Sequence, residues 1–135
     1  MNLIKKKLFI MKIKMTGIFV EDPISAFKFY TEILGFKKLI YMPEAYLAIV
    51  VSPEDEKGTA LLLEPNSNPI AKTYQENVAA EKLPVIVFGV ENVQKEYERL
   101  IELGVQFINK PETNEWGTTA VFDDTCGNFI QIHQD

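Results

Sequence analysis

The sequence predicts an α+β fold made of two similar halves, each in the order strand, helix and three strands. Val20-Glu21-Asp22 in the first half matches Val90-Glu91-Asn92 in the second half at an offset of 70 residues. Gly35 and Gly104, which each follow an apolar helical periodicity, match at an offset of 69 residues. A repeat of this length is typical of a duplicated supersecondary unit, and 135 residues suit a single domain.

The first half begins with a predicted strand at 12–20, followed by a predicted helix at 23–34. Asp22 or Ser25 can cap this helix, and Pro23 suits its first turn because proline has no N–H to leave unpaired there. Short apolar runs between turn-forming residues then predict strands at 37–42, 46–51 and 59–64.

The second half repeats this order after a polar crossover, 65–82, which we predict to contain a short helix at 70–79. A strand at 83–90 precedes a helix that starts near Val93 and ends at Gly104. Further strands are predicted at 105–109, 118–122 and 128–133, and the turn formers at 123–127 predict a hairpin. We therefore expect one domain, 12–135, with modules at about 12–65 and 83–134.

Residues 1–11 are predicted to be an extension outside the domain. Three lysines precede a short apolar run at 8–11, which is too short for the apolar region of a secretion signal. No window approaches the roughly 18 apolar residues of a membrane span. We expect a poorly ordered segment, or alternatively an extra edge strand, in a cytoplasmic protein that does not bind membranes.

Composition and charge exclude several classes of function. The chain has 14 Lys and Arg against 19 Asp and Glu, and this acidity disfavours binding to nucleic-acid phosphates. Its one cysteine, Cys126, excludes an internal disulfide, and its one histidine, His133, excludes metal motifs that need two histidines. A nucleophilic Cys126 would need a nearby base, and no histidine is close in sequence, so we interpret Cys126 as part of a turn.

Two groups of residues resemble the first and last motifs of a known family. Residues 18–23 (IFVEDP), 26–30 (AFKFY) and 34–36 (LGF) resemble its opening strand and helix, and residues 122–130 (FDDTCGNFI) resemble its closing hairpin. The family is the glyoxalase/bleomycin resistance/extradiol dioxygenase family, also called the vicinal oxygen chelate superfamily. The resemblance, over residues 12–134, implies two βαβββ modules that form a cup-shaped mixed sheet around a cavity, in a homodimer.

The resemblance also implies four metal-ligand positions in those members that use a metal, two from each module. In this sequence the positions fall on Met15, Glu64, Val85 and Gln131. Only Glu64 is a good ligand for a divalent ion, since valine has no donor atom and a thioether is soft. Catalytic sites usually have about three protein ligands, so we expect no cofactor. The alternative is an improvised divalent metal site from Glu64, Gln131 and His133, because His133 shares the strand face of Gln131.

Glu64 is the candidate catalytic residue if the protein is an enzyme. A carboxylate in an apolar cup suits a general base, and the resemblance implies proton transfer next to a carbonyl by such a residue. A glyoxalase-like lyase or isomerase, or a dioxygenase-like enzyme, therefore stays open. Arg99 is the only arginine, and recognition of glutathione carboxylates calls for such bidentate donors. The sequence thus disfavours glutathione-dependent glyoxalase I.

Apolar and aromatic residues dominate the predicted cup, which indicates a flat or hydrophobic ligand. The predicted ligand-binding residues are Met15, Tyr46, Val85, Trp116, Thr118, Phe129, Gln131 and His133. Trp116 has polar neighbours, so we expect it at a cavity mouth or an interface. The function predicted first is binding of a small, mostly apolar or aromatic molecule without a catalytic metal. An enzyme that uses Glu64, and a non-catalytic regulatory domain with a vestigial cavity, are the alternatives.

Overall fold

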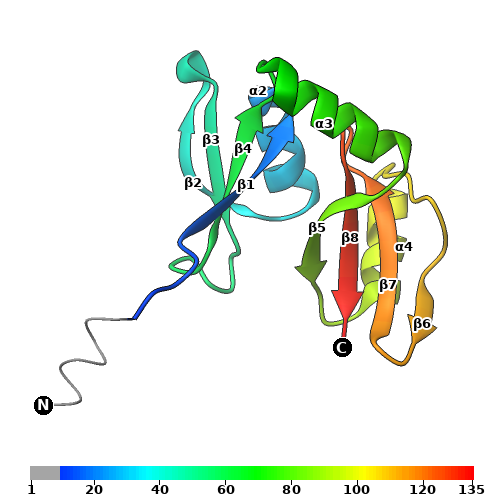
Figure 1. The fold of residues 1–135 in the computed structure, drawn as a ribbon. Coiled ribbons are helices and arrows are strands. Elements are labelled where there is room, and N and C mark those ends of the chain that lie inside the picture. Colours follow the sequence, from blue (N-terminus) through cyan, green and yellow to red (C-terminus); the bar gives the residue numbers. More distant parts are fainter. Residues whose placement is uncertain (1–9) are drawn as a thin grey trace, which may run out of the picture.

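Two four-stranded mixed sheets form the frame of the protein (Figure 1). The computed structural model describes residues 10–135. The strands are β1 (Met15–Val20), β2 (Lys37–Met42), β3 (Leu47–Val51), β4 (Ala60–Pro65), β5 (Pro84–Gly89), β6 (Glu112–Asn114), β7 (Gly117–Asp123) and β8 (Phe129–Gln134). The sheet orders are β1-β4-β3-β2 and β5-β8-β7-β6. β1 runs parallel to its neighbour β4, and β5 runs parallel to its neighbour β8. The predicted α+β class with two βαβββ modules is confirmed.

Capping residues start the helix of each module at matching positions. α2 (Pro23–Lys28) begins at Asp22, and α4 (Val93–Glu102) begins at Asn92. In both cases the side-chain Oδ1 accepts a backbone N–H of the first turn at 3.0 Å. Such bonds satisfy amide groups that a helix leaves unpaired at its start. α2 continues into a π-helical turn, Phe29–Ile33, which completes the helix predicted for the first half.

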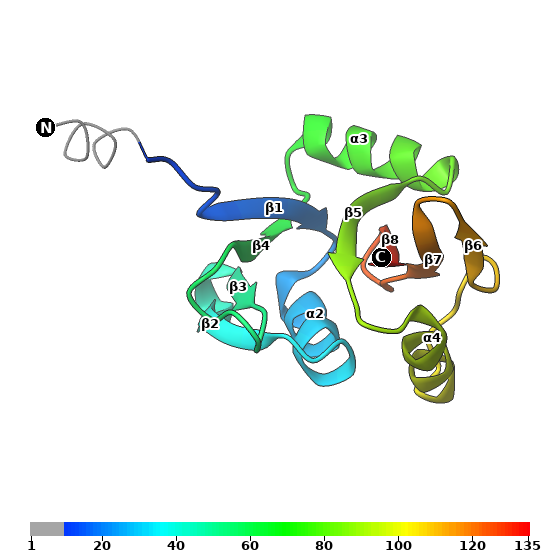
Figure 2. The same ribbon diagram turned by 90° about the horizontal axis from the view of Figure 1, so that it is seen from below.

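α3 (Pro69–Ala80) connects the two modules and lies across one end of the sheets (Figures 1 and 2). It begins at Asn68, whose Oδ1 accepts the N–H of Ile70 at 2.8 Å, and it packs on both β1 and β5. The predicted crossover helix is therefore confirmed. None of the helices within residues 10–135 is long and apolar enough to cross a membrane.

The chain between α4 and β7 differs from the prediction. In place of a strand at 105–109, the segment makes only an isolated bridge between Phe107 and Phe122. The ring of Phe107 packs edge to face on Tyr97, with centroids 4.7 Å apart, and Val105 is buried. These contacts direct the segment into the core, so the second strand of the module forms later, as β6.

The start of the domain also differs slightly from the prediction. β1 begins at Met15 and not three residues earlier. Residues 13 and 14 already bond to the first sheet, because their carbonyl oxygens accept the Thr59 hydroxyl at 2.9 Å and the Ala60 N–H at 3.0 Å. The predicted extension lies outside the described residues, apart from its last two residues, which are exposed.

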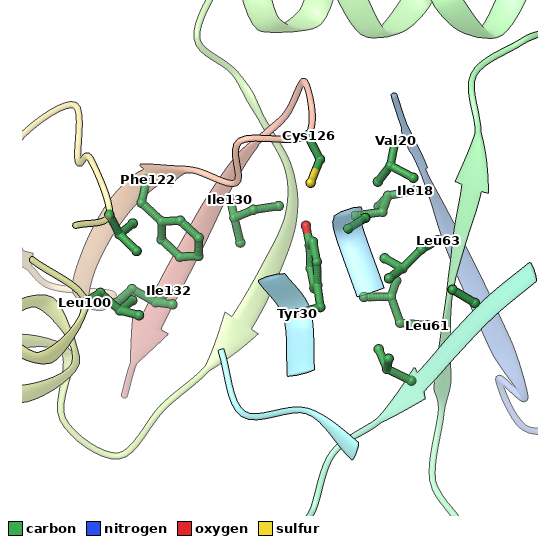
Figure 3. Close-up of a cluster of buried hydrophobic side chains, with 14 of the residues drawn as sticks. Ile18, Val20, Tyr30, Leu61, Leu63, Leu100, Phe122, Cys126, Ile130 and Ile132 are labelled. Atoms are coloured by element: carbon green, nitrogen blue, oxygen red, sulfur yellow. The ribbon is translucent and has the colours of Figure 1, made fainter. Parts of the chain in front are cut away.

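One hydrophobic core joins the two modules (Figure 3). In that view Tyr30 lies between Leu63 of the first sheet and Ile130 of the second sheet. Tyr30 is fully buried, and its ring packs edge to face on Phe88 with centroids 6.4 Å apart. The helical segment of the first module therefore fills the space between the two sheets.

A buried carboxylate, Asp124, binds groups from both modules. Its Oδ2 accepts the Tyr30 hydroxyl at 2.7 Å, and its Oδ1 accepts the N–H groups of Cys126 at 2.7 Å and Asn128 at 3.0 Å. Burial raises the pKa of the Asp124 carboxyl, and the hydrogen bonds from Tyr30 and Asn128 oppose that rise. Burial, together with the charge of Asp124, also raises the pKa of Tyr30 well above its ordinary value.

Two amide side chains extend this network to β1. Nδ2 of Asn128 and Nε2 of Gln75 both donate to the carbonyl oxygen of Phe19, each at 2.8 Å. Gln75 also donates to the carbonyl oxygen of Cys126 at 3.2 Å. No buried side-chain nitrogen or oxygen in the described part of the chain lacks a partner. We call the side chains of Tyr30, Gln75, Asp124 and Asn128 the inter-module clamp.

Removal of the Tyr30 hydroxyl should weaken the clamp without changing the apolar packing. Tyr30→Phe takes one buried partner from Asp124, and hydrogen bonds to charged groups contribute about 1.5–3 kcal/mol. We expect the free energy of unfolding in urea to fall by about that amount. Tyr97→Phe, at the half-buried contact with Phe107, is the control and should change the free energy of unfolding by less than about 0.5 kcal/mol. Equal losses in the two variants would contradict the role of the clamp.

Candidate functional site

Each sheet has a face that points away from the shared core, and we call these the outer faces. Paired residues on neighbouring strands point to the same side of a sheet, and Leu62 pairs with both Gly17 and Ile49. The outer face of the first sheet carries Met15, Gly17, Phe19, Lys37, Ile40, Met42, Leu47, Ile49, Val51, Ala60, Leu62 and Glu64. Its central residues form a second hydrophobic cluster, separate from the main core.

The outer face of the second sheet is more polar. It carries Pro84, Val87, Gly89, Glu112, Asn114, Gly117, Thr119, Val121, Asp123, Phe129, Gln131 and His133. Gln131 lies between Val87 on β5 and Val121 on β7, so its amide is flanked by apolar side chains. Val87 is 52% exposed. The second sheet therefore presents an amide and an imidazole on a partly apolar surface.

Glu64 lies near the end of β4, on the outer face of the first sheet. Its neighbour on β1 is Phe19, and its Oε2 lies over Gly17, where an added methyl group would be 3.7 Å away. It is the only carboxylate in the four strands of this sheet. Glu64 is exposed in the single chain, so one chain alone does not form the enclosed apolar cup expected around it.

Gln131 and His133 share an outer face, but Val85 does not lie beside Gln131. The pairing of β5 with β8 is irregular between Pro84 and Val87, and Val85 packs half-buried against the main core. Val87 takes the position next to Gln131. An irregularity of one residue moves every following side chain to the other face of a strand, and no local pattern in the sequence indicates such an irregularity here.

The other predicted binding residues are spread over the molecule. Met15, at the start of β1, is 47% exposed, and Phe129 is half-buried on the outer face of the second sheet. Tyr46 lies at the tip of the β2–β3 hairpin, with φ 51° and 55% of its surface exposed. Thr118 pairs with Gln134 and lies on the opposite face from Gln131 and His133. The structure therefore does not bring these four residues into one site within the chain.

Trp116 contacts the outer face of the second sheet through its backbone. Its carbonyl oxygen lies 3.0 Å from Nε2 of His133, while 79% of the residue is exposed. Gly117 follows with φ 129°, and a Cβ there would clash with the carbonyl oxygen of Gln134. Glycine is therefore required at this turn, which holds Trp116 at the edge of the sheet beside His133.

Three exposed apolar residues of the outer faces are not among the predicted ligand-binding residues. Ile40, Met42 and Val87 are 42%, 44% and 52% exposed. Ile40 and Met42 are two residues apart and thus lie on one strand face. That alternation was visible in the sequence, whereas the position of Val87 depends on the irregular pairing of β5.

Within one chain, the residues at the four expected ligand positions do not come together around a divalent metal ion. Glu64 and Gln131 of one chain lie on different sheets, with the shared core between those sheets. The His133 ring already contacts the Trp116 carbonyl through Nε2, and its Nδ1 lies 3.5 Å from Oδ1 of Asp135. Within residues 10–135, no three His, Cys, Asp or Glu side chains cluster in a way that could hold a metal. The expected positions supply one carboxylate and one amide, fewer than the usual three or so ligands.

Two βαβββ modules with matched helix starts define a glyoxalase-type fold, and the comparisons with known proteins agree. The sequence profile of the Glyoxalase/Bleomycin resistance protein/Dioxygenase superfamily matches residues 12–132. The chain belongs to this superfamily.

Relatives and solved structures of similar length support that assignment. The uncharacterized protein YurT of Bacillus subtilis (strain 168) is 52% identical over 126 residues, which cover 92% of this chain and 99% of the relative. The crystal structure of UcmS2 is 28% identical, has a TM-score of 0.79 and matches 94% of this chain and 100% of its own. TnmS3, an antibiotic binding protein from Streptomyces sp. CB03234, is 25% identical, with a TM-score of 0.71 and coverage of 93% and 97%.

Cys126 should be unreactive in the folded protein. It is 3% exposed, and burial, assisted by the charge of Asp124, raises the pKa of its thiol from 9.0 to about 12. Since the thiolate is the nucleophile, a rise of three pKa units lowers its population at pH 8 about 1000-fold. We expect alkylation by iodoacetamide at pH 8 to be slower by at least that factor than in guanidinium chloride. Comparable rates in the two states would support a reactive cysteine instead.

Proposed function

We propose that the protein binds a small, mostly apolar or aromatic molecule against its outer faces, without a catalytic metal. The observation that supports this most directly is the outer face of the first sheet. Its centre is wholly apolar, with Leu47, Ile49, Val51, Ala60 and Leu62 packed together away from the main core. Around this buried centre, Met15, Ile40 and Met42 are 42–47% exposed, and exposed apolar patches usually mark a binding site or an interface.

The two outer faces cannot enclose a ligand within one chain, because the core and α2 lie between the sheets. We therefore propose a homodimer in which the first sheet of each copy faces the second sheet of the other. Such a pair has two equivalent cavities, each with one apolar wall and one more polar wall. Pairing of this kind also covers Met15 and Val87, which are about half exposed in the single chain.

The chemistry of the two walls indicates the class of ligand. The apolar wall would remove a ring system from water, which contributes about 25 cal/mol per Å² of buried apolar surface. Glu64, Gln131 and His133 supply the few polar groups that orient a ligand in a mostly apolar site. The net charge of −5 favours a neutral or cationic molecule over an anionic one.

The similarity to TnmS3 supports the same class of function. That protein is described as an antibiotic binding protein, and this chain shares 25% of its residues and nearly its whole length. Binding of a bulky organic molecule between two half-open sheets is consistent with that likeness. The identity of the molecule is a separate question, since one fold can carry different ligands.

A lyase or isomerase that uses Glu64 as general base is the second candidate. It is favoured by the position of Glu64 as the only carboxylate in the strands of the apolar sheet, with its Oε2 over Gly17. Glu64→Gln separates the two functions, because it removes the base and keeps nearly the same shape. A binding protein should keep its affinity for a neutral ligand, whereas an enzyme should lose turnover by at least about 100-fold.

The homodimer should depend on the apolar outer faces. Val87→Lys places a charge on each of two equivalent interfaces, and losing one buried valine costs about 1.5–3 kcal/mol. We expect dimerisation to weaken at least about 100-fold, measured by sedimentation equilibrium. Ile70→Lys, at an 81% exposed residue of α3, is the control and should leave the dimer intact. A dimer unaffected by Val87→Lys would contradict the proposed pairing.

The neutral aromatic dye Nile red tests the proposed site. We expect its fluorescence to rise on binding, with about one dye per chain. Met15→Lys and Val87→Lys should each lower the affinity about tenfold or more by charging an apolar wall, while Glu64→Gln should leave it within about twofold. Chelator treatment should have no effect. Binding that is lost with the chelator, or is indifferent to both lysine substitutions, would contradict the proposal.

A further inference from the structure

We propose that the cleft between the two modules, on the side of the helices, binds a small organic cation with an apolar body. The cleft has a volume of about 870 Å³, within the range of roughly 300–1,000 Å³ that is typical of small-molecule sites. It lies between the π-helical turn and the start of α4, and the loop after β3 and the ends of β5 and β8 also line it. Of the outer-face residues, only Gly89 and His133 reach it.

The wall of the cleft includes aromatic rings from both modules. Phe36 follows the π-helical turn of the first module, and Phe88 comes from β5 of the second. Their centroids are 5.0 Å apart, with the rings at 65° to each other, and both residues are half-buried. The faces of aromatic rings attract cations within about 6 Å. The cleft therefore combines apolar surface with rings that favour positive charge.

The cleft is strongly acidic. Five carboxylates line it, from Glu32, Glu54, Glu91, Glu96 and Asp135, against two cationic side chains, Lys95 and Arg99, and the imidazole of His133. These acids come from four separate parts of the chain, and the structure brings them around one opening.

One of the two basic side chains is already neutralised. Nη2 of Arg99 lies 2.9 Å from Oε2 of Glu96, and its Nη1 donates to the carbonyl oxygen of Ile33 at 3.1 Å. After this pairing, Lys95 is the remaining Lys or Arg side chain of the cleft, and four carboxylates remain besides Glu96. The remaining field favours a positively charged ligand and disfavours an anionic one.

The spacing of the acids favours an organic cation over a metal ion. Calcium and magnesium need several oxygen ligands at about 2.0–2.6 Å. In the described part of the chain, no three acidic or other ligating side chains approach one another closely enough to form such a group. Carboxylates that are spread around an aromatic wall instead suit a larger organic cation. The apolar body of such a cation would contact the rings, and its positive charge would face the carboxylates.

The cationic aromatic dye acridine orange tests the cleft, with fluorescence anisotropy at low salt as the readout. Glu91→Lys reverses one charge of the rim and should weaken binding about tenfold, whereas Lys95→Glu should tighten it about fivefold. An acidic residue in the first turn of α4 suits that helix, so Lys95→Glu should fold normally. Glu102→Lys is the matched control, because it makes the same change of charge on α4 outside the cleft, and it should change the affinity less than twofold.

Four results would overturn the proposal. They are absence of binding, equal weakening by Glu91→Lys and Glu102→Lys, loss of binding in Val87→Lys but not in Glu91→Lys, and a Glu91→Lys variant that dissociates the protein instead of releasing the dye. The second result indicates nonspecific attraction, the third places the dye on the outer faces, and the fourth shows that a second copy occupies the cleft. Selective loss in Glu91→Lys with tighter binding in Lys95→Glu would support the proposal, whether or not Nile red binds elsewhere.

Discussion

The buried carboxylate of Asp124 determines how the two modules are placed relative to each other. A charged or polar group that is removed from water is tolerated only when its hydrogen bonds are complete. Asp124 obtains them from the Tyr30 hydroxyl of the first module and from its own hairpin. Asn128 and Gln75 then tie that hairpin to the end of β1. A different placement of the modules would leave several of these groups unpaired, so the clamp selects one arrangement.

This arrangement decides which surfaces are available for binding. Tyr30 lies between the sheets, and the face of each sheet that points toward the helices is buried in the shared core. The outer faces lie outside this core, and the one on the first sheet has exposed apolar residues at its edges, a buried apolar centre and a single carboxylate. The same geometry leaves a cleft between the helical segments, where acids from both modules gather. The fold thus offers two chemically different surfaces, an apolar one that needs a second copy and an acidic one within each copy.

Local signals in the sequence predicted the fold well, whereas the site depended on features that are not local. The repeat of Val20-Glu21-Asp22 as Val90-Glu91-Asn92 located both helix starts, because a cap is set by neighbouring residues. The prediction of a strand at 105–109 was wrong, because Phe107 packs against the core and the segment forms only an isolated bridge there. Val85 lies on the opposite face of β5 from the one predicted, because the pairing of β5 with β8 is irregular. A local sequence pattern contains no information on how a strand pairs with its neighbour. The acidic cleft was also missed, since its carboxylates meet only after folding.

The central claim is that apolar binding sites form between the first sheet of one copy and the second sheet of another. A mixture of Met15→Lys and Val87→Lys chains tests it most directly, with Nile red stoichiometry as the readout. In a mixed pair, one cavity carries both substitutions and the other carries neither. About half of the pairs in an equimolar mixture are mixed when pairing is random, so mixing two proteins that each bind weakly should restore tight binding to about one dye per four chains. If the mixture binds no more dye than its separate components, the sites do not form between copies and the account is wrong.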